Sequence, residues 1–371
     1  MTKDLIPKIR FKGYTEAWEQ RKLDEISNRF DNLRIPVAAN VREKGTIPYY
    51  GANGIQDYVK GFTHNGEFVL IAEDGANDLK NYPVKYVNGL FWANNHVHVI
   101  QGKKEICNNK YLKYCFSKTN IEALLVGGGR AKLNANIMMG IDLKLCQFDE
   151  QSKIGELFYE IDNLITLHQR KYDKLVELKK SLLEKMFPKN NLLYPETRFN
   201  GFTEAWEQRK LKDIGEILTG STPSTSQEDY YCSDGILWVT PTDIDSNIIK
   251  NTARKLSIKG EKVARIVPKN TILVTCIASI GKNALVLEKS SFNQQINSLT
   301  PFDKYNPYFL LTDSVLWSIK MKQQGAAGMM QIVNKNEFSE IETNIPSEEE
   351  QNKIGELYKQ IDNLITLHQQ K

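Results

Sequence analysis

Residues 151–187 carry apolar residues at helical spacing. This stretch contains no proline and a single glycine, Gly155, which lies in the first turn. The pattern therefore predicts one uninterrupted helix spanning roughly 55 Å, ended by Pro188. Apolar residues recur every three and four positions, as in the seam of a coiled coil. The predicted partner-helix interface on this helix consists of Ile154, Leu157, Ile161, Leu164, Leu175 and Leu178.

The same helical segment occurs twice. Residues 151–171 return as residues 351–371, with about 16 of 21 positions identical. The second copy places Ile354, Leu357, Ile361 and Leu364 in the same register, so the sequence predicts an intramolecular coiled coil. Either this pairing is partial or the C-terminal helix is shortened. His168 and His368 fall on the seam, where a polar interruption that fixes the register is favoured over a metal site.

A second repeat precedes each helix. Residues 10–26 return as residues 198–214, with about 13 of 17 positions identical. The stretches between the repeats, residues 27–150 and 215–350, share little sequence. A repeated frame around different contents indicates that the frame does the same mechanical job twice, while each variable part recognises something different. Trp18 and Trp206 recur within the frame, which favours packing over base stacking.

Both variable parts show short apolar runs separated by Gly and Asn turns, followed by a helical pattern. In the first part, strands are expected within residues 47–59, 66–78 and 89–100, and a helix over residues 108–126. In the second, strands are expected within residues 236–244, 270–287 and 291–301, and a helix over residues 305–325. IPYYGANGI (47–55) aligns with ILWVTPTDI (236–244), and GGGRAKLN from Gly127 aligns with GAAGMMQIVN from Gly325. The expected fold class is α+β, with two modules of one topology.

The amino-acid composition excludes some classes of protein but does not identify a function. The chain has 371 residues, with 41% hydrophobic and 25% charged residues, which is typical of a folded protein with more than one core. No apolar run of roughly 18 residues and no signal peptide is evident, so a cytoplasmic protein without a membrane partner is expected. The five cysteines are scattered without a CxxC pair, so reduced thiols are expected. A net charge of +4 is compatible with DNA binding but too small to demonstrate it.

Several motifs in fixed order carry a family resemblance. They are the repeated AWEQRKL, then IPYYGANGI, EDGA and FWANNHVHV, then TPS, ILWVTPTDI, ILVT and IG, and the twin helices KIGELxxxIDNLITLHQ. The chain resembles the specificity subunits of type I restriction-modification systems. The resemblance implies target recognition domains at residues 1–150 and 189–350, on an antiparallel coiled coil formed by residues 151–188 and 351–371.

The resemblance also implies a function and a set of partners. The chain would be a non-catalytic reader of a two-part double-stranded DNA site, with one half-site for each domain. Two methyltransferase subunits would bind it, together with two restriction subunits for cleavage. No cofactor or metal is expected in this chain, because S-adenosylmethionine, ATP and magnesium would belong to the partner subunits.

Candidate DNA-binding residues come from the predicted loops, because amide and guanidinium groups read base edges. In the first module they are Tyr50, Asn53, Glu73, Asp74, Asn94, Asn95, His96, Arg130 and Lys132; in the second, Thr240, Thr242, Asp243, Ser279, Lys282, Asn293, Gln294 and Gln295. Glu73 and Asp74 could accept from a cytosine amino group, and Arg130 and Lys282 follow glycines and suit phosphates. The alternative for any one Asn or Gln is a turn hydrogen bond.

Two other classes of function stay open. A coiled-coil adaptor would share the helices but would not bind DNA specifically. A DNA methyltransferase or nuclease would need a phosphate loop, a cofactor loop or an NPPY-like tetrapeptide, and none is found. The closest match, Asn306-Pro307-Tyr308-Phe309, lacks the second proline and is interpreted as a helix start.

Overall fold

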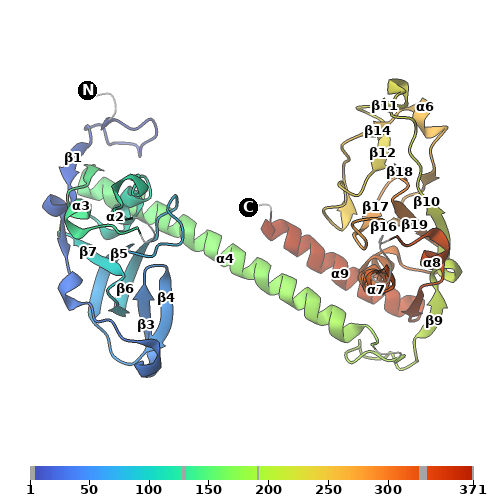
Figure 1. The fold of residues 1–371 in the computed structure, drawn as a ribbon, viewed down its shortest axis with the longest axis horizontal. Coiled ribbons are helices and arrows are strands. Elements are labelled where there is room, and N and C mark those ends of the chain that lie inside the picture. Colours follow the sequence, from blue (N-terminus) through green and yellow to red (C-terminus); the bar gives the residue numbers. More distant parts are fainter. Residues whose placement is uncertain (1–4, 128–130, 190–191, 326–331, 370–371) are drawn as a thin grey trace. The chain divides into compact units, whose positions relative to one another are not determined.

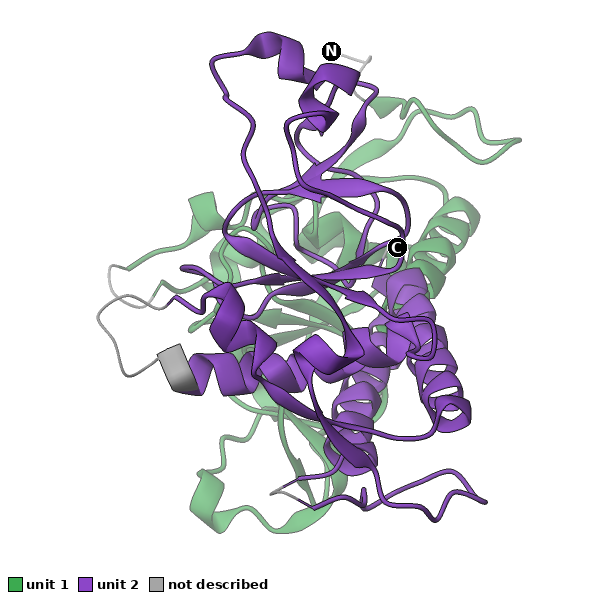
Figure 2. Cartoon of the chain, turned by 90° about the vertical axis from the view of Figure 1, so that its right-hand side faces the viewer, with its two compact units in different colours: residues 1–167 green, residues 168–371 purple. Residues whose placement is uncertain are grey.

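The computed structural model describes residues 5–127, 131–189, 192–325 and 332–369. The chain divides into two compact units, residues 1–167 (unit 1) and 168–371 (unit 2), which are coloured separately in Figure 2. Both units mix strands and helices, and unit 2 repeats elements of unit 1 in the same order (Figure 1). The predicted α+β class with two modules is confirmed.

Unit 1 is built on one six-stranded sheet. Its strands, in spatial order, are β2 (Ser27–Arg29), β7 (Val97–Gly102), β5 (His64–Ala72), β6 (Val84–Ala93), β3 (Lys44–Gly51) and β4 (Gly54–Val59). Neighbours are antiparallel except β3 and β6, which are parallel. The central strand β5 is buried on both faces, because Val69 and Ile71 join one apolar cluster while Phe68 and Leu70 join another.

Short elements surround this sheet. They are β1 (Glu19–Lys22), α1 (Leu23–Ile26), α2 (Asn109–Phe116), α3 (Ala135–Met139), β8 (Asp142–Leu145) and the start of α4 (Phe148–Met186), with 3₁₀ turns at Asp31–Leu33, Ala39–Val41 and Glu122–Leu124. The helix expected over residues 108–126 is shorter, since α2 ends at Phe116. The polar run that follows, Ser117 to Asn120, forms turns instead.

Unit 2 contains two five-stranded sheets. The first has the order β10 (Gly215–Thr219), β19 (Ile296–Pro301), β16 (Thr271–Thr275), β17 (Asn283–Val286) and β13 (Ile248–Ile249). The second has the order β11 (Tyr231–Cys232), β14 (Lys255–Leu256), β12 (Ile236–Val239), β18 (Ser290–Phe292) and β15 (Ile266–Val267). The remaining elements are β9 (Glu207–Lys210), α5 (Leu211–Ile214), a 3₁₀ turn (Glu228–Tyr230), α6 (Ile258–Glu261), α7 (Pro307–Gly325), α8 (Lys335–Ser339), β20 (Glu342–Ile345) and α9 (Glu348–Gln369).

The repeated sequence forms the same frame in both units. A two-stranded antiparallel pair, β1 with β8 in unit 1 and β9 with β20 in unit 2, precedes each long helix. Arg10 makes two hydrogen bonds to Glu150 at 2.7 and 2.8 Å, and Arg198 makes the same two bonds to Glu350. Trp206 is buried, and Trp18 packs against the core of unit 1, as the packing interpretation predicted.

Within unit 2, the C-terminal part of α4 runs antiparallel to α9. The ring nitrogens Nδ1 of His168 and His368 lie 2.9 Å apart, and Lys179 Nζ lies 2.5 Å from Asp362 Oδ1. On α9, Ile354 and Ile361 are buried. The other seam residues of α9 are partly buried Leu357 and exposed Leu364.

The N-terminal part of α4 differs from the predicted seam. Ile154 packs against the core of unit 1, but Leu157, Ile161 and Leu164 are 47, 39 and 54% exposed. In the part that belongs to unit 2, Leu175 is partly buried and Leu178 is 47% exposed. None of the six predicted seam residues of α4 is fully buried, so the buried seam predicted along this helix is not observed; beside α9 the buried residues are Met186 at the end of α4 and Phe187 directly after it. No helix among the described residues is both long and apolar enough to cross a membrane.

Candidate nucleic-acid interface

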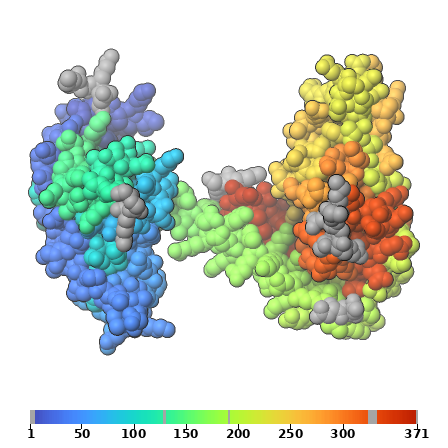
Figure 3. Space-filling model, viewed as in Figure 1, coloured from blue at the N-terminus to red at the C-terminus, as the bar shows by residue number. Residues whose placement is uncertain are grey.

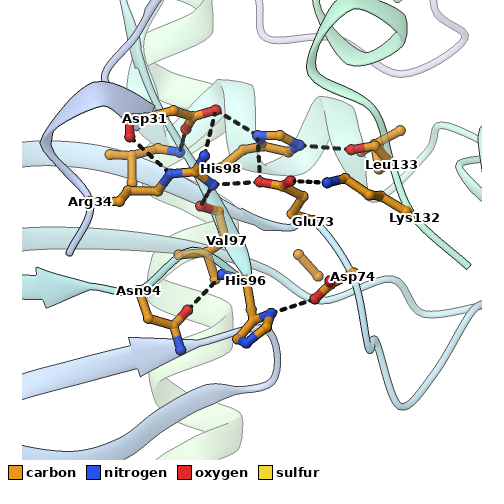
Figure 4. A network of polar contacts seen from close by, with 12 residues as sticks. Asp31, Arg34, Glu73, Asp74, Asn94, His96, Val97, His98, Lys132 and Leu133 are labelled. Atoms are coloured by element: carbon orange, nitrogen blue, oxygen red, sulfur yellow. Dashed lines mark hydrogen bonds and ion pairs between the residues drawn. The ribbon is translucent and has the colours of Figure 1, made fainter. Parts of the chain in front are cut away.

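In unit 1 the candidate residues gather where β3, β5 and β6 end. The parallel pairing of β3 and β6 brings Tyr50 beside the turn that follows β6, and the Asn94 amide donates to the Tyr50 carbonyl at 3.1 Å. The Asn94 side chain then accepts from the His96 amide at 2.8 Å. The His96 carbonyl accepts from the Glu73 amide at 2.9 Å. Figure 4 shows the Asn94 side chain bonded to the His96 backbone, with Glu73 nearby.

The adjoining loops are tied to this turn. Asn53, in the β3–β4 turn, donates to the Gly75 carbonyl at 3.0 Å and accepts from the Asn77 amide at 2.9 Å. Asp74 Oδ1 lies 2.6 Å from His96 Nδ1. Asn95 is exposed at the tip of the turn. The structure thus brings together the predicted residues of the first module, apart from Arg130, which lies outside the described residues.

A buried ion-pair network lies behind this surface (Figure 4). Glu73 contacts Arg34 at 2.5 Å and Lys132 at 2.6 Å. Although burial alone would raise the pKa of Glu73, the hydrogen bonds from Lys132 and Arg34 outweigh it and hold that pKa below its usual value. The side chain is only 11% exposed, so Glu73 is a member of this network more than a surface group.

His98 connects the network to the loop that carries Lys132. Its Nε2 donates to the Leu133 carbonyl at 2.8 Å, because a carbonyl oxygen can only accept, and its Nδ1 lies 2.7 Å from Asp31 Oδ2. Burial would raise the pKa of Asp31, but the hydrogen bonds from His98 and the Val99 amide, together with the charge of Arg34, outweigh this and lower it. Asp31, Glu73 and His98 lie close enough to hold one metal ion. Arg34 and Lys132 already contact their carboxylates, so we interpret the cluster as structural ion pairing.

Unit 2 repeats the turn with different side chains. The Asn293 amide donates to the Val239 carbonyl at 2.9 Å, and the Asn293 side chain accepts from the Gln295 amide at 3.0 Å. The Gln295 carbonyl accepts from the Cys276 amide at 2.8 Å. These bonds match those of Tyr50, Asn94, His96 and Glu73 one for one. The predicted alignment of residues 47–55 with 236–244 is therefore confirmed for the strand residues, since Tyr50 and Val239 occupy the same position.

The loops of unit 2 place the other candidates beside this turn. Thr240 donates through its backbone and its hydroxyl to Asp243 at 2.8 and 2.6 Å, and its hydroxyl lies 2.8 Å from that of Thr242. Lys282 Nζ donates to the Pro241 carbonyl at 3.3 Å. Gln294 is exposed at the tip, as Asn95 is in unit 1, and contacts Thr222. Ser279 is also exposed, in the turn after β16.

The buried layer differs between the units. The amides of Leu133 and Val333 donate to the carbonyls of Glu73 and Cys276 at 2.7 and 2.9 Å. Where His98 donates to Leu133, Asn297 donates to Val333 at 3.5 Å and to Cys276 Sγ at 3.1 Å. Burial raises the pKa of Cys276 to about 12, so this thiol stays neutral. The same set of backbone hydrogen bonds is therefore supported by ion pairs in unit 1 and by neutral side chains in unit 2.

Several of these supporting residues do not follow from sequence inspection. Asp31 and Arg34 reach Glu73 and His98 from a segment far away in the sequence, so no local spacing points to them. His98 could be recognised from the sequence as a supporting residue. It lies within the buried strand run Val97–Ile100, where a polar side chain needs hydrogen-bond partners. Asn297 stands in β19, in a strand run of the same kind.

Two units with one backbone framework and different exposed side chains define a paired recognition scaffold. The family described as "Type I restriction modification DNA specificity domain" matches this chain twice, over residues 15–177 and 203–371. The chain therefore belongs to the specificity subunits of type I restriction-modification systems. Members of this family are non-catalytic and bind DNA through target recognition domains as part of the restriction-modification complex.

Relatives support the assignment along the whole chain. A protein of Haemophilus influenzae that carries the name of a type I restriction enzyme specificity subunit, S.HindORF215P, is 32% identical over 93% of this chain and 88% of its own length. The MjaIX specificity subunit of Methanocaldococcus jannaschii is 33% identical over 46% of this chain and 41% of its own length. The crystal structure of the type I S subunit of M. genitalium has the same fold. It superposes with a TM-score of 0.72 at 12% identity, covering 98% of this chain and 94% of that one.

Proposed function

We propose that this specificity subunit reads a bipartite DNA site, with one half-site contacted by unit 1 and the other by unit 2. The observation that carries the proposal is the shared turn framework. Asn94 and Asn293 make the same backbone and side-chain bonds, yet the residues at the tips of the two turns differ. The same support with different exposed groups suits two surfaces that read different sequences.

We assign the candidates two roles according to their burial. Asn94 and Asn293 are buried and engaged in the turn, so they position the tip instead of reading bases. We propose that the exposed or half-exposed groups beside them contact base edges, where amides pair with adenine. These groups are Tyr50, Asn53, Asn95 and His96 in unit 1, and Thr240, Thr242, Gln294 and Gln295 in unit 2.

The charged candidates have further roles. Asp74, held by His96, and Asp243, held by Thr240, could accept from a cytosine amino group while keeping the turns in place. The Glu73 carboxylate holds the Lys132 side chain in place through their ion pair. Lys132, Lys282 and Ser279 are exposed at loop ends and suit phosphates, and Arg130 keeps the same predicted role.

The partners follow from the family. We propose two methyltransferase subunits bound to this chain, and two restriction subunits for cleavage. S-adenosylmethionine, ATP and magnesium would be bound by those subunits. Residues 1–150 and 189–350 would be the target recognition domains, with residues 151–188 and 351–371 as the helical spacer. The competing function, a coiled-coil adaptor, would not require two matched turns that present polar side chains.

A sequencing experiment tests the proposal. The chain is produced with its methyltransferase partner in cells that lack other DNA modification, and the methylated motif is read by modification-sensitive sequencing. Two matched variants, Asn95→Ala and Gln294→Ala, change the tips of the two turns. Each should relax one half-site and leave the other intact, since a lost base contact costs roughly 1–3 kcal/mol. Equal relaxation of both half-sites by either variant would refute the assignment of one half-site to each unit.

A further inference from the structure

Two histidines face each other where the repeated helices meet in unit 2. His168 of α4 and His368 of α9 occupy the same position of the repeated sequence LITLHQ. Their Nδ1 atoms lie 2.9 Å apart, their ring centroids lie 5.1 Å apart, and both side chains are partly exposed. Figure 3 shows the red surface of α9 beside the green surface of α4. When two copies of one helix pair antiparallel, a residue meets its own counterpart only at the two-fold axis that relates them. The repeat therefore brings two identical imidazoles together at that point.

The short distance between the two rings limits where their protons can be. One Nδ1 donates a hydrogen bond and the other accepts it, so the accepting Nδ1 carries no proton and presents a lone pair. The donating ring presents a second lone pair once its proton is carried on Nε2, the other tautomer of a neutral imidazole. Neutral imidazole is the commonest metal ligand in proteins. Two such ligands can therefore face the same small volume between the helices.

The distance between the nitrogens indicates which metal ion they fit. Bonds from imidazole nitrogen to a transition metal are about 2.0–2.1 Å long. Two nitrogens 2.9 Å apart therefore subtend an angle of about 90° at the ion. Neighbouring positions of a square-planar or tetragonal ion are separated by this angle, which suits Cu²⁺ or Ni²⁺. Tetrahedral zinc would need the nitrogens about 3.3 Å apart, and Mg²⁺ and Ca²⁺ prefer oxygen ligands.

We propose that His168 and His368 form a binding site for a divalent transition-metal ion of square-planar or tetragonal geometry, Ni²⁺ or Cu²⁺, which links α9 to α4. Among the residues that the structure describes, no carboxylate or thiol joins the two rings as a third ligand. Water would fill the remaining positions, so binding depends on both imidazoles. A bound ion would also strengthen the role in fixing the helix register that the sequence indicates for these residues. This inference does not depend on the proposed DNA-reading function.

The other histidines of the chain supply the matched control. His64 and His98 are 2 and 1% exposed and are held by hydrogen bonds inside unit 1. His96 is partly exposed and lies beside Asp74. The variant His96→Gln therefore removes an accessible imidazole without touching the proposed site. The thiol of Cys232 is exposed and could also bind a soft metal, so all measurements use a Cys232→Ser background.

Titration with Ni²⁺ alone tests the proposal. The full chain, produced without a histidine tag, is titrated by isothermal calorimetry. We expect one Ni²⁺ per chain, with saturation by about 100 μM free metal. His168→Asn and His368→Asn should each weaken binding at least about tenfold, because each leaves a single imidazole at the site. Asn keeps a hydrogen-bonding group between the helices, and His96→Gln should bind Ni²⁺ as the parent does.

Three results of the titration would overturn the proposal. They are the lack of saturable binding at that concentration, binding that survives both Asn substitutions, and binding that His96→Gln abolishes. A stoichiometry of one Ni²⁺ for two chains would place the ion between copies, which also contradicts the site. X-ray absorption of the loaded chain checks the geometry, since a tetrahedral nickel environment would contradict the angle between the two nitrogens.

Hydrogen exchange tests whether the ion links the helices. A ligand that binds only the paired helices stabilises the paired state, so saturating Ni²⁺ should slow amide exchange in α9 of the parent and leave His368→Asn unchanged. Without metal, the Asn variants should exchange like the parent in the sheets of unit 2, which shows that they are folded. Unchanged exchange of α9 in the loaded parent would overturn the link between the helices.

Discussion

Replacing Glu73 with Gln tests whether the ion-pair network supports the turn at residues 94–96 of unit 1. The substitution keeps the shape of the side chain and removes its charge. The contact with Lys132, whose side chain is 46% exposed, should contribute little, at most about 1 kcal/mol. The contact with Arg34 is better shielded, with side chains 16 and 11% exposed, and a charge-assisted bond contributes about 1.5–3 kcal/mol.

Because Gln can still accept one bond from Arg34, we expect Glu73→Gln to lower the free energy of unfolding of unit 1 by about 2 kcal/mol at pH 7. The effect should depend on pH. The pKa of Glu73 is lowered in the folded state, so its stabilisation is present above the unfolded pKa of about 4.3 and is lost as the pH falls through the folded value. The difference between variant and wild type should therefore shrink below about pH 4.

Urea unfolding monitored by hydrogen-exchange mass spectrometry can follow peptides of unit 1 separately, including the segment around Leu133. Glu122→Gln, at an exposed position of the same unit, is the control and should have no effect. An unchanged stability at pH 7, or a loss that is the same at pH 7 and pH 3, would refute the reasoning from charge.

Three further predictions concern buried groups. His98→Asn introduces the residue type that unit 2 uses at Asn297, so it should cost only about 1–2 kcal/mol in urea unfolding and less than His98→Ala, which leaves the Leu133 carbonyl unpaired. Phe187→Ala should cost about 3–5 kcal/mol in unit 2, because the ring is 2% exposed among aromatic neighbours; a loss below about 1 kcal/mol would contradict this packing. Burial raises the pKa of Asp313 to about 6, so unit 2 should lose stability as the pH rises from about 4 to 6, and Asp313→Asn should abolish that loss in pH-dependent unfolding.

The parts of the fold that repeat in sequence were the most predictable. Near-identity of two segments indicated a duplicated frame, and the matched Arg10–Glu150 and Arg198–Glu350 pairs show that the frame folds twice in the same way. The helix start at Asn306 was also foreseen, since its side chain accepts from the Tyr308 and Phe309 amides at the beginning of α7. Local patterns of this kind depend on neighbouring residues alone.

The extent of helix pairing was harder to predict. The heptad pattern in α4 is the same on both sides of His168, yet Leu157, Ile161 and Leu164 before it and Leu178 after it are all exposed. A periodic apolar stripe shows that a helix is suited to pairing, but it does not say which segment will cover each turn. Leu157 and Ile161 therefore fitted the pattern of a buried seam and are exposed.

The turns at residues 94–96 and 293–295 each contain a buried residue that holds the turn and an exposed residue at its tip. Asn94 and Asn95 are adjacent and chemically identical, so sequence alone gives both the same role as base readers. In the structure Asn94 is buried and closes the turn, while Asn95 stands at its exposed tip, and Asn293 and Gln294 repeat the division. Changing the tip residue alters no bond of the framework, whereas changing the residue beside it removes one. If the tips read bases as proposed, substitution of Asn95 or Gln294 would change one half-site while Asn94 and Asn293 stay in place.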